Sequence, residues 1–158
     1  FSTSTVVARS RAVQQAGEFD EGIFGPEDWD MWRRVAEGWG CLAVVAPLCA
    51  YRERNESVSG DAARMLENNR KVLKKAFEEN PDVPWHVRAR AFSYLHLDAA
   101  LEWMPGAPWR AAVELAKTIG MWPLSFGMVV HRPFIRAKLA VQVIMETCRR
   151  TGRSVSFK

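Results

Sequence analysis

A glycine-punctuated loop leads directly into a helix in the stretch Glu18-Phe-Asp-Glu-Gly-Ile-Phe-Gly-Pro-Glu-Asp-Trp-Asp-Met-Trp-Arg-Arg-Val35. Pro26 suits the first position of a helix, because that position needs no backbone N–H donor. We therefore predict a helix that starts at Pro26 and ends near Gly38 or Gly40. Three acidic residues fall close to its start: Glu27, Asp28 and Asp30.

These acids have a structural and a functional interpretation. In the structural one, acids in a first turn complement the helix dipole, and Asp30 pairs with Arg33 or Arg34 three and four residues on. A stripe of apolar residues would then bury the helix: Trp29, Trp32, Ala36 and Trp39. In the functional one, a carboxylate at the rim of a cleft acts as a general base.

Outward from this stretch, both helices and strands are expected. The segments Ser2–Ala8, Cys41–Ala46 and Leu48–Arg52 have the length and composition of strands. A short helix is predicted at Arg9–Ala16 and a long one from Ser57 onward. After the break at Asn80-Pro81, helical spacing predicts an all-helical second half, with helices at Trp85–Met104, Trp109–Trp122 and Pro133–Arg150.

Four motifs occur in a specific order: a Val-rich opening with Arg9-Ser10 and a short helix, Gly17-x-Phe19-Asp20-Glu21, Glu27-Asp28-x-Asp30-x-Trp32-x-Arg34, and Tyr51-Arg52-x-x-x-x-Ser57-x-Ser59. Together they resemble the C-terminal half of the catalytic domain in glycosyltransferase family 2. Each motif is weak by itself, but their order and spacing are specific. The resemblance covers roughly Ser2 to Asn80.

The resemblance implies an α/β fold class. Residues 1–80 would be the C-terminal, acceptor-side half of a GT-A nucleotide-diphospho-sugar transferase fold, predominantly helical with a few short strands. Residues 81–158 would be a helical C-terminal extension. The implied activity is inverting transfer of a sugar from a nucleotide-diphospho-sugar to a hydroxyl acceptor.

The resemblance also assigns roles to individual residues. Asp28 would be the catalytic base that takes the proton of the attacking hydroxyl. Glu27 and Asp20 would bind the acceptor. Arg54 stands where family members often have histidine; it is either a ligand of the leaving diphosphate or a solvated loop residue. An arginine cannot ligate a metal, but its fork of donors fits a phosphate.

The donor-binding half of such an enzyme, with its Asp-x-Asp element, is not recognisable in these 158 residues. A divalent metal, Mg or Mn, would be bound mainly by that half, and no metal ligand is assigned here. We therefore expect the chain to be inactive by itself. The rival hypothesis is a non-catalytic helical module that binds a partner or a membrane surface.

Composition and charge limit the function classes further. The net charge is +4, and the segment from Arg132 to Lys158 holds seven Lys or Arg against one Glu. No nucleic-acid-binding motif accompanies this charge, so nucleic acid is not an expected partner. The three cysteines have neither metal-ligand spacing nor the even count of a disulfide framework, which favours a cytoplasmic protein. No apolar stretch is long enough to span a bilayer.

The basic C-terminal helix has an apolar stripe along one side: Phe134, Ala137, Val141, Ile144 and Cys148. We expect this stripe to pack against the preceding helices, because such stripes usually face a core. The alternative is a peripheral contact with an anionic membrane surface, on the inner face of a membrane.

Overall fold

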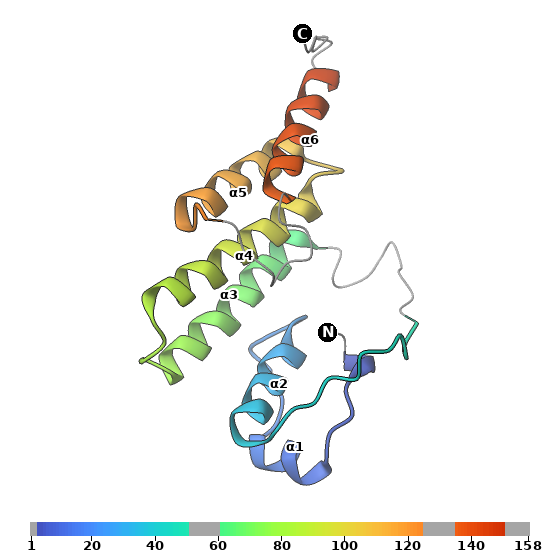
Figure 1. The fold of residues 1–158 in the computed structure, drawn as a ribbon, viewed down its shortest axis with the longest axis vertical. Helices are drawn as coiled ribbons and strands as arrows, with labels where there is room; N and C mark the ends of the chain where they lie inside the picture. The colour runs from blue at the N-terminus through green and yellow to red at the C-terminus, as the bar shows by residue number, and fades with distance from the viewer. Residues whose placement is uncertain (1–2, 51–60, 125–134, 151–158) are drawn as a thin grey trace. The chain divides into compact units, whose positions relative to one another are not determined.

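The computed structural model describes residues 3–50, 61–124 and 135–150, and helices are the regular secondary structure of these residues. In chain order they are η1 (Thr3–Thr5), α1 (Ser10–Ala16), α2 (Glu27–Gly38), α3 (Ala62–Glu79), α4 (Trp85–Trp103), α5 (Pro108–Met121) and α6 (Ile135–Arg150) (Figure 1). The chain divides into two compact units, Phe1–Ala76 and Phe77–Lys158, here named unit 1 and unit 2.

The core of unit 1 lies between α1 and α2. Ala12, Met31 and Val35 are buried there, and the partly buried residues around them are Val13, Ala16, Trp32 and Trp39. Met31 and Val35 are four residues apart and so lie on the same side of α2. The predicted apolar stripe of this helix is therefore only half right: Trp32 and Trp39 pack on the core, whereas Trp29 and Ala36 are exposed.

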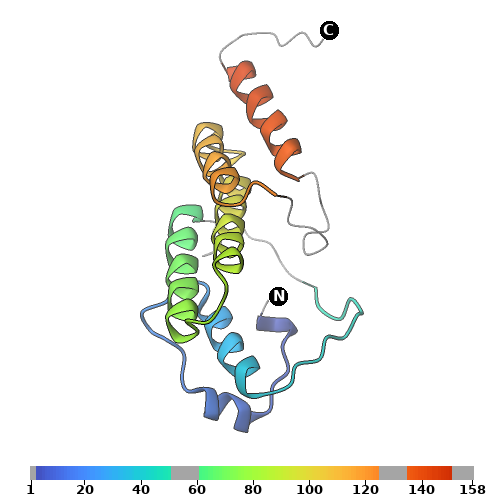
Figure 2. The ribbon, with the colours of Figure 1, turned by 60° about the vertical axis from the view of Figure 1, so that its left-hand side comes forward.

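The core of unit 2 lies among α4, α5 and α6, which correspond to the three helices predicted for the second half. Its buried residues are Leu97, Ala100, Leu115 and Leu139. Small residues such as Ala100 and Ala111, both fully buried, let helices approach closely. Figure 2 shows α6, in red, extending beyond the ends of α4 and α5.

The predicted α/β fold class, a portion of a GT-A fold, is wrong for this chain. The described residues contain no strand and no sheet. Residues 3–5 of the first predicted strand form the short helix η1, and 41–46 and 48–50 have no regular structure. Residues 51 and 52 lie outside the described part.

The physical reason for this error is the absence of pairing. A short apolar run forms a strand only when a neighbouring strand satisfies its backbone and a core covers one of its faces. In the structure the side chains of Val7, Leu42 and Val45 are almost fully exposed. These short apolar runs have no described segment to pair with, so their composition predicted strands that do not form.

Candidate functional site

The start of α2 is built by the loop that precedes it. Pro26 is the N-cap residue of the helix, and Glu27 is its first residue. The Oε2 atom of Glu27 accepts a hydrogen bond of 2.5 Å from the backbone N–H of Gly25. Gly25 has a φ of +107°, a conformation that residues with a Cβ rarely adopt. The carboxylate of Glu27, predicted to bind the acceptor, therefore contacts the backbone of its own loop.

Asp28 lies in the first turn of α2 and is half-buried. Its Oδ2 atom accepts a hydrogen bond of 2.6 Å from the hydroxyl of Thr3, in η1. Within residues 3–50, 61–124 and 135–150, the structure records no ion pair between Asp28 and a cationic side chain. The carboxylate is held in place by a neutral donor and has oxygen lone pairs left for another ligand.

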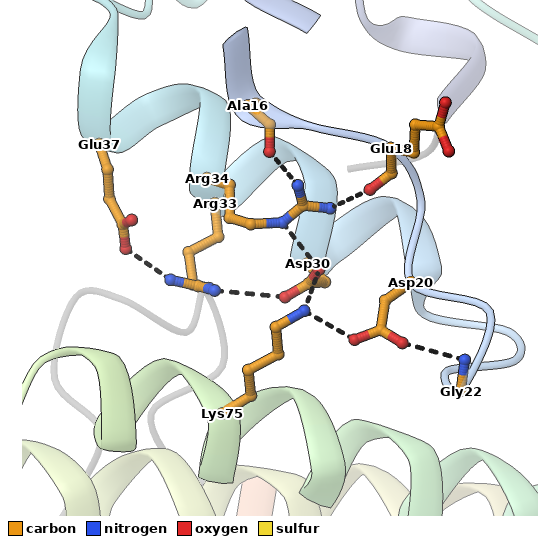
Figure 3. A network of polar contacts seen from close by, with 9 residues as sticks. All are labelled: Ala16, Glu18, Asp20, Gly22, Asp30, Arg33, Arg34, Glu37 and Lys75. Atoms are coloured by element: carbon orange, nitrogen blue, oxygen red, sulfur yellow. Dashed lines mark hydrogen bonds and ion pairs between the residues drawn. The ribbon is translucent and has the colours of Figure 1, made fainter. Parts of the chain in front are cut away.

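Asp30 has the opposite environment, although it is only two residues further along α2. Its side chain is fully buried, with an exposed fraction of 0%. Three cationic groups contact it: Arg34 Nε at 2.9 Å, Lys75 Nζ at 3.0 Å and Arg33 Nη2 at 3.2 Å (Figure 3). The predicted pairing of Asp30 with Arg33 or Arg34 is confirmed, and both arginines take part.

Lys75 and Arg34 extend this network to the loop before α2. Lys75 Nζ also contacts Asp20 at 2.7 Å, and Asp20 accepts a hydrogen bond of 2.9 Å from the N–H of Gly22. Asp20, predicted to bind the acceptor, therefore joins Asp30 through Lys75. Its recorded contacts do not include Asp28 or Glu27.

Arg34 holds the other end of the same loop. Its guanidinium donates to the carbonyl oxygens of Ala16 and Glu18, the latter at 2.8 Å. Gly17 between them has a φ of +84°, and a Cβ there would lie 3.4 Å from Arg34 Nη1. The positive φ is the reason that glycine suits this position, because a Cβ at 3.4 Å from the guanidinium would be in ordinary van der Waals contact. Neither this role of Arg34 nor any role of Lys75 was predicted from the sequence.

Burial and hydrogen bonds to charged partners shift the pKa values of the groups in this network in opposite directions. Burial acts to raise the pKa of Asp30, but hydrogen bonds from Lys75, Arg33 and Arg34 outweigh it and lower that pKa below its ordinary value of 3.8. Hydrogen bonds from Lys75 and from the Gly22 N–H likewise lower the pKa of Asp20. Burial acts to lower the pKa of Lys75, and its bonds to Asp20 and Asp30 raise it above 10.5.

These shifts predict how stability depends on pH. A carboxylate whose pKa is lower in the folded protein than in the unfolded chain stabilises the folded state. For Asp30 this stabilisation is complete above the ordinary pKa of 3.8, and it is lost as the pH falls through the lower pKa of the folded protein. We expect Lys75→Met to lower the free energy of unfolding by about 2 kcal/mol at pH 7. We also expect the wild type to lose more stability than this variant between pH 5 and pH 2. Without Lys75, the pKa values of Asp20 and Asp30 in the folded protein return toward their ordinary value, so protonating these carboxylates costs the variant less stability.

Urea denaturation followed by circular dichroism at several pH values measures both effects. Lys74→Met is the matched control, since Lys74 is the exposed neighbour of Lys75 on α3. If both substitutions changed the urea midpoint equally, Lys75 would have no structural role in the network.

Comparisons with known proteins do not identify a family or a function for this chain. No protein-family model, no curated protein and no solved structure matches the chain. A functional assignment therefore depends on the residues themselves and on the contacts around α2.

Two expectations remain: Arg54 as a ligand of the leaving diphosphate, and a divalent metal that the resemblance assigns mainly to a donor-binding half, with no ligand among these residues. Arg54 lies outside the described residues. In the part of the chain that the structure describes, no group of three or more His, Cys, Asp or Glu side chains is arranged to hold a metal ion. Asp30 is surrounded by three cations and is unsuited as a metal ligand. The described residues therefore do not fit a divalent metal.

A second buried polar cluster lies between α4 and α5, in unit 2. His96 Nδ1 contacts Glu114 Oε2, and Lys117 Nζ contacts Glu114 Oε1 at 2.6 Å. Burial acts to raise the pKa of Glu114, but the bonds from Lys117 and His96 lower it below the ordinary value of 4.5. Each buried group thus has a charged or polar partner, which indicates a structural role for His96 and Glu114.

Proposed function

We propose that this chain supplies the acceptor side and the catalytic base of an inverting glycosyltransferase, with Asp28 as the base. The observation that carries the proposal is the contrast within the first turns of α2. Asp30 is fully buried among three cations, whereas Asp28 is half-buried and accepts a hydrogen bond only from the Thr3 hydroxyl among the described residues. The order of motifs that resembles glycosyltransferase family 2 gives the same position to the base.

The proposed chemistry is a single displacement. The Asp28 carboxylate accepts the proton of the acceptor hydroxyl while that oxygen forms a bond to the anomeric carbon of the donor sugar. The bond from the anomeric carbon to the nucleoside diphosphate breaks, and the diphosphate leaves with the electron pair. Asp30 cannot serve as this base, because its carboxylate is enclosed and its pKa is lowered.

The network around Asp30 would act as a support for the base. It fixes the first turns of α2 against the loop that contains Asp20 and against Lys75 of α3. A base must be held close to its productive position, and a helix start anchored on several sides provides this. In this proposal Glu27 and Asp20 contribute to acceptor binding, and Arg54 to binding the leaving diphosphate. No step of the proposal uses a metal.

A transfer assay tests the proposal. The gene product that contains this chain would be incubated with a panel of nucleotide-diphospho-sugars and hydroxyl acceptors, and released nucleoside diphosphate would be measured. We expect release that depends on the acceptor with at least one pair. An absence of transfer from every donor would favour the rival hypothesis of a non-catalytic helical module.

The 158-residue chain alone is expected neither to bind a nucleotide-sugar tightly nor to transfer sugar. The reason is that its residues include no recognisable donor site. Titration calorimetry with the same donor panel measures this directly. One-to-one binding tighter than about 1 mM would contradict the proposal that the donor binds elsewhere.

A further inference from the structure

The helix α6 has two apolar sides, and among the residues that the structure describes only one of these sides is covered. Leu139 belongs to the buried core of unit 2, and Val143, four residues further along the helix, is also buried. Val141, Ile144 and Met145 are 47%, 53% and 54% exposed. At roughly 100° of rotation per residue, these three lie on the side opposite to Leu139 and Val143.

This arrangement corrects the prediction for the apolar stripe of the C-terminal helix. Of its members that the structure describes, Ala137, Val141 and Ile144 are exposed and Cys148 is partly buried, so the stripe as a whole is not buried against the preceding helices. The helix instead uses a second set of apolar residues, four apart, to join the core. The exposed set, Ala137, Val141, Ile144 and Met145, is here named the outer face of α6.

Cationic side chains flank the outer face. Lys138 precedes Val141 by three residues and Arg149 follows Met145 by four, so both lie beside the exposed apolar residues. Both are exposed. The segment from Arg132 to Lys158 contains seven Lys or Arg and a single Glu. The apolar surface is therefore set in a strongly positive part of the chain.

We propose that α6 docks on an anionic lipid surface, with its outer face in the boundary between head groups and acyl chains. Apolar side chains flanked by Lys and Arg are the pattern of helices that lie in this boundary. Positive charge draws them to anionic lipids by about 1 kcal/mol per cation. In the described residues no helix has the length and apolarity required to cross a bilayer. The helix would therefore lie along the surface.

The charge also distinguishes this occupant from a second copy of the chain. A symmetric pairing of two outer faces would bring Lys138 and Arg149 of each copy close to those of the other. Like charges at an interface oppose association, whereas an anionic surface neutralises them. The proposal is independent of sugar transfer, because it uses no residue of unit 1.

Vesicle co-sedimentation of the 158-residue chain tests the proposal. We expect binding to vesicles of phosphatidylcholine with about a third phosphatidylglycerol, and much weaker binding to phosphatidylcholine alone. Raising the NaCl concentration from about 0.1 M to about 0.5 M should weaken binding, because it screens the cations. The double substitution Val141→Glu, Ile144→Glu should weaken binding by about tenfold or more, since it removes the inserted apolar groups.

Val87→Glu is the matched control. Val87 is 43% exposed in the first turn of α4, and the change adds the same side chain away from α6. Circular dichroism would verify that all variants keep their helix content. Equal binding of the double variant and the wild type would overturn the proposal, as would a lack of binding to anionic vesicles. A wild-type dimer that the double substitution dissociates would also overturn it, by assigning the outer face to a second copy.

Discussion

Replacing Asp28 with Asn is expected to slow sugar transfer by about two to four orders of magnitude in the gene product that contains this chain. Asparagine keeps the size of the side chain and can still accept the hydrogen bond from Thr3, which is 2.6 Å long in the structure. It cannot accept the proton of the acceptor hydroxyl. The melting temperature should therefore change little, while the rate of sugar transfer falls strongly.

The control for this experiment is Glu18→Gln, which removes one negative charge from an exposed side chain in the preceding loop. We expect it to leave the rate nearly unchanged, because Arg34 contacts the carbonyl oxygen of Glu18 and not its carboxylate. Similar, small effects of both substitutions would show that Asp28 is not the base. A large fall in stability for Asp28→Asn would instead give it a structural role.

Replacing Asp30 with Ala is expected to lower the free energy of unfolding by about 3 to 5 kcal/mol. The substitution removes the shared partner of Arg33, Arg34 and Lys75 from a fully buried position. It leaves these cations partly buried without their common counter-charge, and it releases the contact between α2 and Lys75. Urea denaturation at pH 7 measures the loss.

Glu37→Ala is the matched control on the same helix. Glu37 pairs with Arg33 at 2.5 Å, but its side chain is 47% exposed. An exposed ion pair contributes only about 0.2 to 1 kcal/mol, so the control should unfold almost like the wild type. A loss below about 1 kcal/mol for Asp30→Ala would contradict the structural role given to this carboxylate.

The sequence predicted local features of α2 well, because they depend on spacing along one helix. The helix was predicted to start at Pro26 because proline suits a first helical position, and the structure begins it one residue later, with Pro26 as the N-cap. The pairing of Asp30 with Arg33 and Arg34 follows from their spacing of three and four residues. Lys75 could not be found in this way. It lies 45 residues from Asp30 in sequence, and only the tertiary structure joins them.

The wrong predictions of strands and of the buried side of α6 have a common physical cause: the sequence does not show which segments pack against each other. The run from Cys41 to Ala46 has the composition of a strand, but no described segment pairs with it. In α6 the sequence offers two apolar stripes, and spacing alone does not say which one faces the core. The structure buries Leu139 and Val143 and leaves Val141 and Ile144 exposed. The GT-A fold was predicted from a resemblance in motifs, and the described helices do not form it.

The stereochemistry of the transfer product tests the central proposal most directly. A single displacement assisted by one base inverts the anomeric carbon, whereas two successive displacements retain its configuration. Proton NMR of the product made from an α-linked nucleotide-diphospho-sugar would give the configuration from the coupling of the anomeric proton. We expect a β-linked product whose formation is lost in Asp28→Asn. An α-linked product, or a β-linked product formed equally well by Asp28→Asn, would contradict the assignment of Asp28 as the base of an inverting transferase.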